Sequence, residues 1–219
     1  MVEAYNVHDE GENVKKWLQE NGSAIVIGLV LAFGGLFGFN QWQAWEANNK
    51  AQAFAEFEAM NELLTDGQLD AAISNFQNLQ DDYAGSPYTA MAALQMGRAR
   101  LEANQPDLAI KHYRYALEHG HPKALRVVAR ERLARMLLDQ GQLDEALVTI
   151  NGETDISGFE ARYAEARGDI LYAQGKNDEA IAAYQEALDT LEAGSGDRAM
   201  LVLKLESLGV VTDDEANAS

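Results

Sequence analysis

Cysteine is absent from the 219 residues of this sequence. Its absence excludes disulfide bonds, a thiol nucleophile, cysteine zinc sites and a lipid-modified cysteine, and it is compatible with any redox compartment. Proline occurs three times, and β-branched runs are few beside abundant alanine, leucine, glutamate and glutamine. Because proline interrupts helices and the abundant residue types favour them, the composition predicts an all-α fold.

Basic residues are also scarce, with 17 lysines and arginines against 35 aspartates and glutamates and a formal charge of −18. A negative surface repels phosphate backbones and anionic lipid headgroups, and it favours solubility. We therefore expect no nucleic-acid partner.

Long apolar runs are missing as well, apart from residues 23–45, which read SAIVIGLVLAFGGLFGFNQWQAW. No charged residue lies between Glu20 and Glu46. About 20 apolar residues are enough to cross a hydrocarbon core of about 30 Å, and this run is apolar on every side, unlike an amphipathic core helix. The run predicts a single transmembrane helix over residues 23–43.

A cleaved signal peptide is the main alternative for this run. Signal peptides have a positive N-terminal region and small residues before the cut, whereas residues 1–22 carry five acids against Lys15 and Lys16. The far end of the run is bulky, with Phe37, Phe39, Trp42 and Trp45. These flanks favour a permanent anchor.

The flanking charges also predict the orientation of the anchor. Lys15 and Lys16 lie on the N-terminal side, and Lys50 is the one base close by on the other. Because basic residues favour the cytoplasmic side, the N-terminus is expected in the cytoplasm. The expected organisation is a cytoplasmic tail (1–22), the transmembrane helix (23–43), a helical domain (44–208) and an acidic disordered tail (209–219).

Small residues are spaced along one face of the anchor. Ala24, Gly28, Ala32 and Gly35 follow each other at spacings of four, four and three. Such residues let two membrane helices approach closely, although glycine and alanine are also simply common in membrane helices. The spacing predicts a helix-packing face.

The rest of the chain contains a repeat. Four stretches align: GQLDAAISNF, NQPDLAIKHY, GQLDEALVTI and GKNDEAIAAY, and each places an alanine five residues after its start. The alanines lie 37, 37 and 34 residues apart, and the last spacing is that of a tetratricopeptide repeat. Two copies also have a glycine twelve residues before the alanine and a tyrosine four after it; the first and third have Met60 and Ala134 at the glycine position.

The repeat predicts a tetratricopeptide-like α-solenoid of about four helical hairpins, because a hairpin needs a tight turn and then a small residue where two helices touch. The repeat signature consists of Ala72, Gly97, Ala109, Tyr113, Ala146, Gly168, Ala180 and Tyr184. Helices are predicted over residues 44–65, 69–81, 88–103, 107–118, 123–139, 143–150, 159–173, 178–192 and 198–207.

The order of these parts resembles the ancillary SecYEG translocon subunit family. The resemblance covers the whole chain and rests on KKWLQENG, the apolar run that follows it and the degenerate tetratricopeptide hairpins. It implies a single-pass protein of the bacterial inner membrane with a periplasmic solenoid beside the Sec translocon. The implied role is non-enzymatic: with a membrane-anchored periplasmic prolyl-isomerase-like chaperone, it helps to pass exported polypeptides to folding factors. The stronger acidity of this chain departs from the family.

No residue pattern indicates catalysis, a cofactor or a metal. His112, His119 and His121 are close together, but they lack the spacing of a ligand pair on one helix, and the last two flank a glycine in a predicted loop. The carboxylates have no base nearby and read as solvated faces. An enzyme or metal-binding protein that uses the histidine loop remains an alternative, as does a membrane-tethered scaffold for another cell-envelope complex.

Positive charge gathers in the middle of the chain, where nine of the 17 basic residues lie between Arg98 and Arg135. Arg126, Arg130, Arg132 and Arg135 recur along one predicted helix, the first of the third hairpin. In a solenoid this helix tends to line the concave side, so the four arginines are candidate partner-binding residues. The alternative is internal pairing with acids of the neighbouring repeats.

Overall fold

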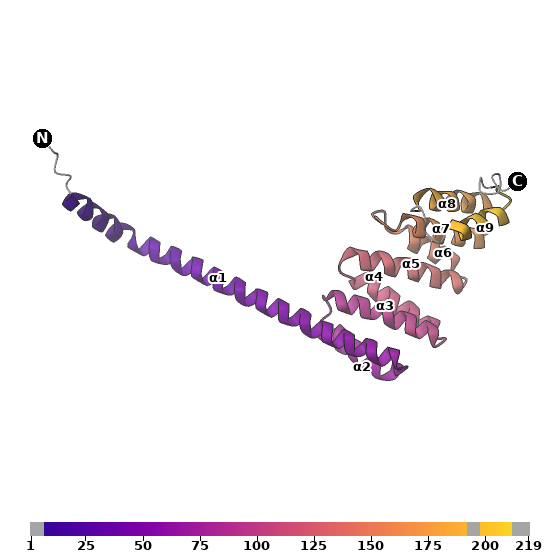
Figure 1. Cartoon of the computed structure of the whole chain (residues 1–219), viewed down its shortest axis with the longest axis horizontal. Helices are drawn as coiled ribbons and strands as arrows, with labels where there is room; N and C mark the ends of the chain where they lie inside the picture. Colours follow the sequence, from indigo (N-terminus) through magenta and orange to yellow (C-terminus); the bar gives the residue numbers. More distant parts are fainter. Residues whose placement is uncertain (1–6, 192–197, 212–219) are drawn as a thin grey trace. The chain divides into compact units, whose positions relative to one another are not determined.

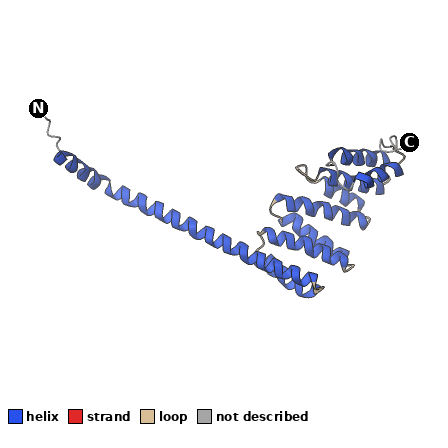
Figure 2. Cartoon of the chain, viewed as in Figure 1, coloured by secondary structure: helices blue, strands red, loops and turns tan. Residues whose placement is uncertain are grey.

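The computed structural model describes residues 7–191 and 198–211, and the elements there are helices without any strand (Figure 2). The predicted all-α class is confirmed. Residues 1–6, residues 192–197 between the last two predicted helices, and the predicted acidic tail from residue 212 lie outside the described residues. The chain forms two compact units, Met1–Ala51 and Gln52–Ser219, which are described separately.

The helices follow each other along the chain as labelled in Figure 1. They are α1 (Val7–Thr65), α2 (Leu69–Asp82), α3 (Pro87–Glu102), α4 (Pro106–His119), α5 (Lys123–Asp139), α6 (Leu143–Asn151), α7 (Glu160–Ala173), α8 (Asn177–Thr190) and α9 (Arg198–Ser207). From α2 to α9 their ends lie within two residues of the predicted ends. The first helix is longer than predicted, because it begins at Val7 and no proline interrupts the chain before Pro87.

In the first unit, α1 carries the apolar run. Its most apolar 18-residue window has a mean hydropathy of 2.1 and no buried side chain. Among the described residues, α1 is the one helix long and apolar enough to cross a membrane. A core helix of a soluble protein would bury such a surface, so the exposed run fits the predicted anchor.

The second unit is a stack of four helical hairpins: the end of α1 with α2, then α3 with α4, α5 with α6, and α7 with α8. Three of the turns contain a glycine with positive φ, namely Gly67 at 73°, Gly141 at 71° and Gly175 at 76°, and Asn104 replaces glycine in the second turn at 57°. These angles favour glycine or asparagine, and each turn closes with a backbone bond such as Gln142 N to Leu137 O at 2.8 Å.

The signature residues lie in the core of this stack. The four alanines, Ala72, Ala109, Ala146 and Ala180, are fully buried, and Tyr113 and Tyr184 are nearly so. Gly97 and Gly168 lie directly under the rings of Tyr113 and Tyr184, where a Cβ atom would come closer than 3.0 Å to the ring. The glycine and the tyrosine therefore let α3 approach α4, and α7 approach α8.

One side of the stack is formed by the first helix of each hairpin. Helix α3 contacts α5, and α5 contacts α7, whereas no comparable contact joins α4 to α6 or α6 to α8 within the described residues. Helices on the inside of a curved stack are closer together than those on the outside. Residues 52–65 of α1 and helices α3, α5 and α7 therefore form what we name the inner face.

Candidate protein-binding surface

The repeat register shows which side chains reach the inner face. The positions of Met60, Gly97, Ala134 and Gly168 are equivalent, since each precedes a signature alanine by twelve residues. Residues that are the same number of positions along the sequence from these four residues form rows that run across the stacked helices. Because neighbouring helices present equivalent positions to the same side, each row has a common chemical environment.

Two of these rows are apolar. The upper row consists of Phe54, Met91 and Val128, and the lower row of Leu64, Leu101, Leu138 and Tyr172. Four of these seven side chains are substantially exposed: Phe54 (45%), Met91 (36%), Leu101 (44%) and Tyr172 (54%). Apolar side chains exposed in register on adjacent helices form an extended surface suited to a partner.

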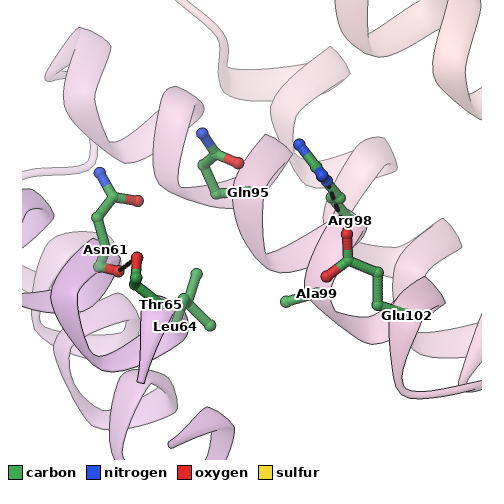
Figure 3. A pocket seen from close by; sticks show the side chains of 7 residues that line it. All are labelled: Asn61, Leu64, Thr65, Gln95, Arg98, Ala99 and Glu102. Carbon is green, nitrogen blue, oxygen red and sulfur yellow. Dashed lines mark hydrogen bonds and ion pairs between the residues drawn. The ribbon is translucent and has the colours of Figure 1, made fainter. Parts of the chain in front are cut away.

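Mostly polar side chains beside the lower row line a pocket of about 360 Å³. Figure 3 shows this pocket, which is formed by α1 and α3 and lined by Asn61, Leu64, Thr65, Gln95, Arg98, Ala99 and Glu102. Thr65 donates to the backbone oxygen of Asn61 at 2.9 Å, and Arg98 pairs with Glu102 at 2.8 Å. The side-chain amides of Asn61 and Gln95 bond to no described residue, so both remain available to a ligand.

Ion pairs occupy the inner face farther along the stack. Arg135 of α5 contacts Glu131 on its own helix, Glu165 at 3.2 Å and Asp169 at 3.3 Å on α7. Lys204 of α9 contacts Glu165 and Asp169 at 2.7 Å each. We name these residues, with Arg162, which pairs with Glu131, the ion network. It joins α5, α7 and α9.

The network shifts the pKa values of Arg135 and Glu165. Burial lowers the pKa of Arg135, but the carboxylates of Glu131, Glu165 and Asp169 outweigh burial and raise it. Burial raises the pKa of the Glu165 carboxyl, but Lys204 and Arg135 together hold it below its ordinary value. Glu131 is 2% exposed, and its two arginine partners, Arg135 and Arg162, offset the cost of burying it.

Three of the four candidate partner-binding arginines form hydrogen bonds or ion pairs within the chain. Arg126 donates to the oxygen of Gly120 at 2.7 Å, Arg130 to that of Thr149 at 3.1 Å, and Arg135 belongs to the ion network. Arg132 lies beside the Tyr113 hydroxyl and forms no ion pair with a described residue. The contacts of Arg135 therefore favour internal pairing, which is the alternative to partner binding.

The predicted packing face of the anchor is open. Ala24, Gly28, Ala32 and Gly35 are exposed on α1, and a Cβ atom at Gly28 or Gly35 would meet nothing within 4 Å. The four residues lie along one side of a helix that no other described part of the first unit covers. Their role in packing remains a prediction.

The histidines form no site in the described part of the chain. His112 packs edge-on against Phe76, and burial, assisted by Arg100, lowers its pKa to about 4. His119 stacks on Tyr115 at 4.4 Å. No group of three or more metal-ligating side chains occurs among the described residues.

Sequence reasoning missed the two apolar rows and the ion network. The rows could have been found by extending the repeat register from the signature glycines to the flanking positions. The network could not, because its partners are as far as 39 residues apart and no short motif contains them.

Comparison with known proteins agrees with this architecture. A family model described as a tetratricopeptide repeat-like domain matches residues 15–210. The chain is 30% identical to the ancillary SecYEG translocon subunit of Haemophilus influenzae, over 94% of this chain and 100% of that protein. It is 29% identical to the same subunit of Aggregatibacter actinomycetemcomitans over the same shares.

Among solved structures, MamA 41-end from Desulfovibrio magneticus RS-1 is similar in fold. It has a TM-score of 0.53 and 17% identity, and the match covers 72% of this chain and 89% of that one. The fold and the matched model define a tetratricopeptide repeat-like protein. Within this class, the chain belongs to the ancillary SecYEG translocon subunit family, as the resemblance of its parts predicted.

Proposed function

We propose that this protein is an inner-membrane subunit that binds proteins at the SecYEG translocon and catalyses no reaction. The observation that carries the proposal is the combination of an exposed apolar anchor with a solenoid whose inner face is partly open. The names of the Haemophilus and Aggregatibacter relatives support the translocon as the site of action. A solenoid offers an extended surface for polypeptides and lacks a deep site that excludes water for chemistry.

We further propose the topology and boundaries that the flanking charges predict. Residues 1–22 lie in the cytoplasm, 23–43 cross the membrane, and 44–208 form a periplasmic solenoid that is followed by the acidic tail. Lys15 and Lys16 support this orientation, and Trp17 on one side and Trp42 on the other suit the two interfaces. In the periplasm the solenoid would meet exported polypeptides and, in the finer form of the proposal, pass them to a membrane-anchored prolyl-isomerase-like chaperone.

The test is co-purification from native membranes with a tag on the full-length chain. The translocon, and the chaperone in the finer form, should be recovered in detergent extracts from cells with normal expression. Recovery of a different envelope complex without the translocon would favour the alternative of a scaffold for that complex.

Protease treatment of intact spheroplasts tests the topology. The solenoid should be digested while the cytoplasmic tail is protected. Protection of the solenoid until the membrane is lysed would contradict the proposed orientation.

A further inference from the structure

Helix α6 is shorter than the second helices of the other three hairpins. Helices α2, α4 and α8 end ten residues after their signature alanine, whereas α6 ends five residues after Ala146. The five missing residues correspond to about 7.5 Å of helix. In the other hairpins the residue seven positions after the alanine is buried, as Leu79, Ala116 and Ala187. In the third hairpin this position is Glu153, which lies in the loop that follows α6.

Contacts with α5 hold this loop, which covers residues 152–159. Lys123, the first residue of α5, contacts Asp155 at 2.7 Å and Glu153 at 3.3 Å. The hydroxyl of Ser157 donates to Asp155 at 3.2 Å. The loop does not fill the space at the end of α6, and a pocket of about 350 Å³ remains between α6, the loop, α7 and α8.

This pocket has an apolar part and a polar part. Ile150, Ile156 and Tyr163 supply the apolar part. The polar part consists of Asn151, Glu153, Thr154, Arg167 and Glu186. The Asn151 amide and the Thr154 hydroxyl bond to no described residue, so both are available to a ligand. We name it the outer pocket, because α6 and α8 are second helices of their hairpins and do not belong to the inner face.

The charges around the outer pocket favour a cation. Arg167 pairs with Glu186 at 3.1 Å, and Lys123 is shared by Glu153 and Asp155, so that three carboxylates face two bases. Glu153 is ionised at neutral pH, because the backbone N–H of Asp155 and then Lys123 hold the pKa of its carboxyl below its ordinary value. The formal charge of −18 on the whole chain also attracts cations and repels anions.

The size and the lining of the outer pocket fit one long side chain. Ligand sites range from about 300 to 1,000 Å³, and this pocket is near the lower limit. A lysine or arginine can place its apolar stem on Ile150 and Ile156 while its charged end reaches the polar part. An acid would add a negative charge to an excess of carboxylates, and an aliphatic side chain would leave Asn151 and Thr154 without partners.

We propose that the outer pocket binds the side chain of a lysine or arginine that a partner protein presents. Its stem packs on Ile150 and Ile156, and its charged end donates hydrogen bonds to Glu186 and to the Thr154 hydroxyl. This inference rests on the proposed function and adds a binding site apart from the inner face.

Methyl NMR of the full-length chain, labelled at isoleucine and held in nanodiscs of zwitterionic lipid, measures the binding. The probe is a nine-residue peptide of glycine, serine and alanine with one central arginine. The methyl signals of Ile150 and Ile156 should shift until they reach saturation, whereas those of Ile73 and Ile110 should not. A matched peptide with citrulline, which has the shape of arginine without its charge, should bind at least tenfold more weakly.

Two sets of variants test the pocket itself. Thr154→Trp fills it and should abolish the shifts, and Glu153→Gln combined with Glu186→Gln should weaken binding fivefold or more. Glu62→Gln combined with Glu118→Gln is the matched control, because it removes the same charge from exposed carboxylates outside the pocket, and it should change affinity less than twofold. Circular dichroism identifies a variant that fails to fold, and the other variant and the citrulline peptide then decide.

Four results would overturn the proposal. These are equal binding of the citrulline peptide, unchanged shifts in folded Thr154→Trp, an equal loss of affinity in the control variant, and shifts at Ile73 and Ile110 as large as those in the pocket. Spermidine supplies cations without a protein side chain. If it saturates the same signals at a tenfold lower concentration than the arginine peptide, the ligand is a free polyamine and the proposal of a partner protein fails.

Co-purification with the translocon separates this inference from the proposed function. If the parent recovers the translocon but the arginine peptide shifts no signal of the outer pocket, the pocket proposal fails and the proposed function stands. If the pocket binds the arginine peptide but the parent recovers no translocon, the proposed function fails and the pocket stands.

Discussion

Two tyrosines set the distance between paired helices in the second and fourth hairpins. The ring of Tyr113 lies over Gly97, and that of Tyr184 lies over Gly168. The Tyr184 hydroxyl donates a hydrogen bond to Asp169 at 2.9 Å. A side chain at either glycine would have to displace a buried ring. The two copies with tyrosine have glycine at this position, whereas the copies with Phe76 and Ile150 have Met60 and Ala134.

We expect Gly97→Ala and Gly168→Ala each to destabilise the solenoid by about 1 to 2 kcal/mol. Overpacking costs about 1 to 3 kcal/mol, and the better helix propensity of alanine offsets up to about 1 kcal/mol of it. Urea unfolding followed by circular dichroism of the detergent-solubilised chain measures the change. Gly85→Ala is the control, because a Cβ atom there meets nothing within 4 Å, and it should lie within about 0.5 kcal/mol of the parent. Parent-like stability of Gly97→Ala would contradict the close contact.

His112 makes the stability of the solenoid depend on pH. The free imidazole binds its proton near pH 6.5, whereas the folded one does so near pH 4, because burial and then Arg100 oppose its charge. The unfolded state therefore binds more protons between these values, and stability falls as the pH is lowered through this window.

We expect His112→Phe to remove this contribution. Between pH 7 and 5.5, the parent should lose about 0.5 to 1 kcal/mol more of its unfolding free energy than the variant, with allowance for the solvent-exposed part of the ring. Urea unfolding at the two pH values measures it. An identical pH dependence in both proteins would mean that another group is responsible.

At the scale of helices, the ion network fixes α9 and α7 to α5. Lys204 of α9 contacts Glu165 and Asp169, and its neighbours Leu201 and Leu205 are buried in an apolar cluster. Apolar packing holds the last helix to the stack. The charges then determine which way it faces, because Lys204 must reach acids that Arg135 also contacts.

We expect Arg135→Met to cost about 2 to 4 kcal/mol, since Glu131 would be left buried with Arg162 as its remaining partner. Arg114→Met is the matched control, because it breaks a pair with Glu145 in which both side chains are about half exposed, and it should cost less than about 1 kcal/mol. Thermal unfolding of the two variants compares them. Equal losses would show that the network contributes no more than a surface pair.

The helices could be predicted from the sequence because their ends carry local signals. All three prolines lie at helix starts, at Pro87 and Pro106 and just before α5 at Pro122, and Gly67, Gly141 and Gly175 lie in the turns. The register of the alanines then predicted which residues are buried. Partners of charged groups could not be predicted in this way, since Arg135 and Glu165 are 30 residues apart and any nearby acid would have fitted the composition equally well.

At the scale of the whole molecule, the anchor and the solenoid have opposite requirements. The anchor exposes apolar side chains along α1, whereas the solenoid buries its apolar residues and carries most of the acidic charge. On the proposed topology, partners would meet the protein in two media. In water the inner face would offer free amides and exposed apolar side chains, and in lipid the predicted packing face formed by Ala24, Gly28, Ala32 and Gly35 would offer close backbone approach.

The anchor face can be tested separately from the solenoid. We expect Gly28→Leu combined with Gly35→Leu to abolish co-purification of the partner whose membrane helix packs there, because leucine side chains would keep the two backbones apart. Both glycines lie on an uncovered side of α1, so the fold of the solenoid and the insertion of the helix should be unaffected.

Val26→Leu combined with Phe33→Leu is the control, since these positions lie on the opposite side of the helix, and it should leave co-purification intact. Membrane fractionation and circular dichroism check insertion and folding in both variants. If the glycine variant co-purifies with the translocon as the parent does at normal expression, the helix only tethers the protein. Recognition would then belong to the solenoid, where the effect of Phe54→Ser with Met91→Ser on the same co-purification would show whether the exposed apolar side chains of the inner face contribute to it.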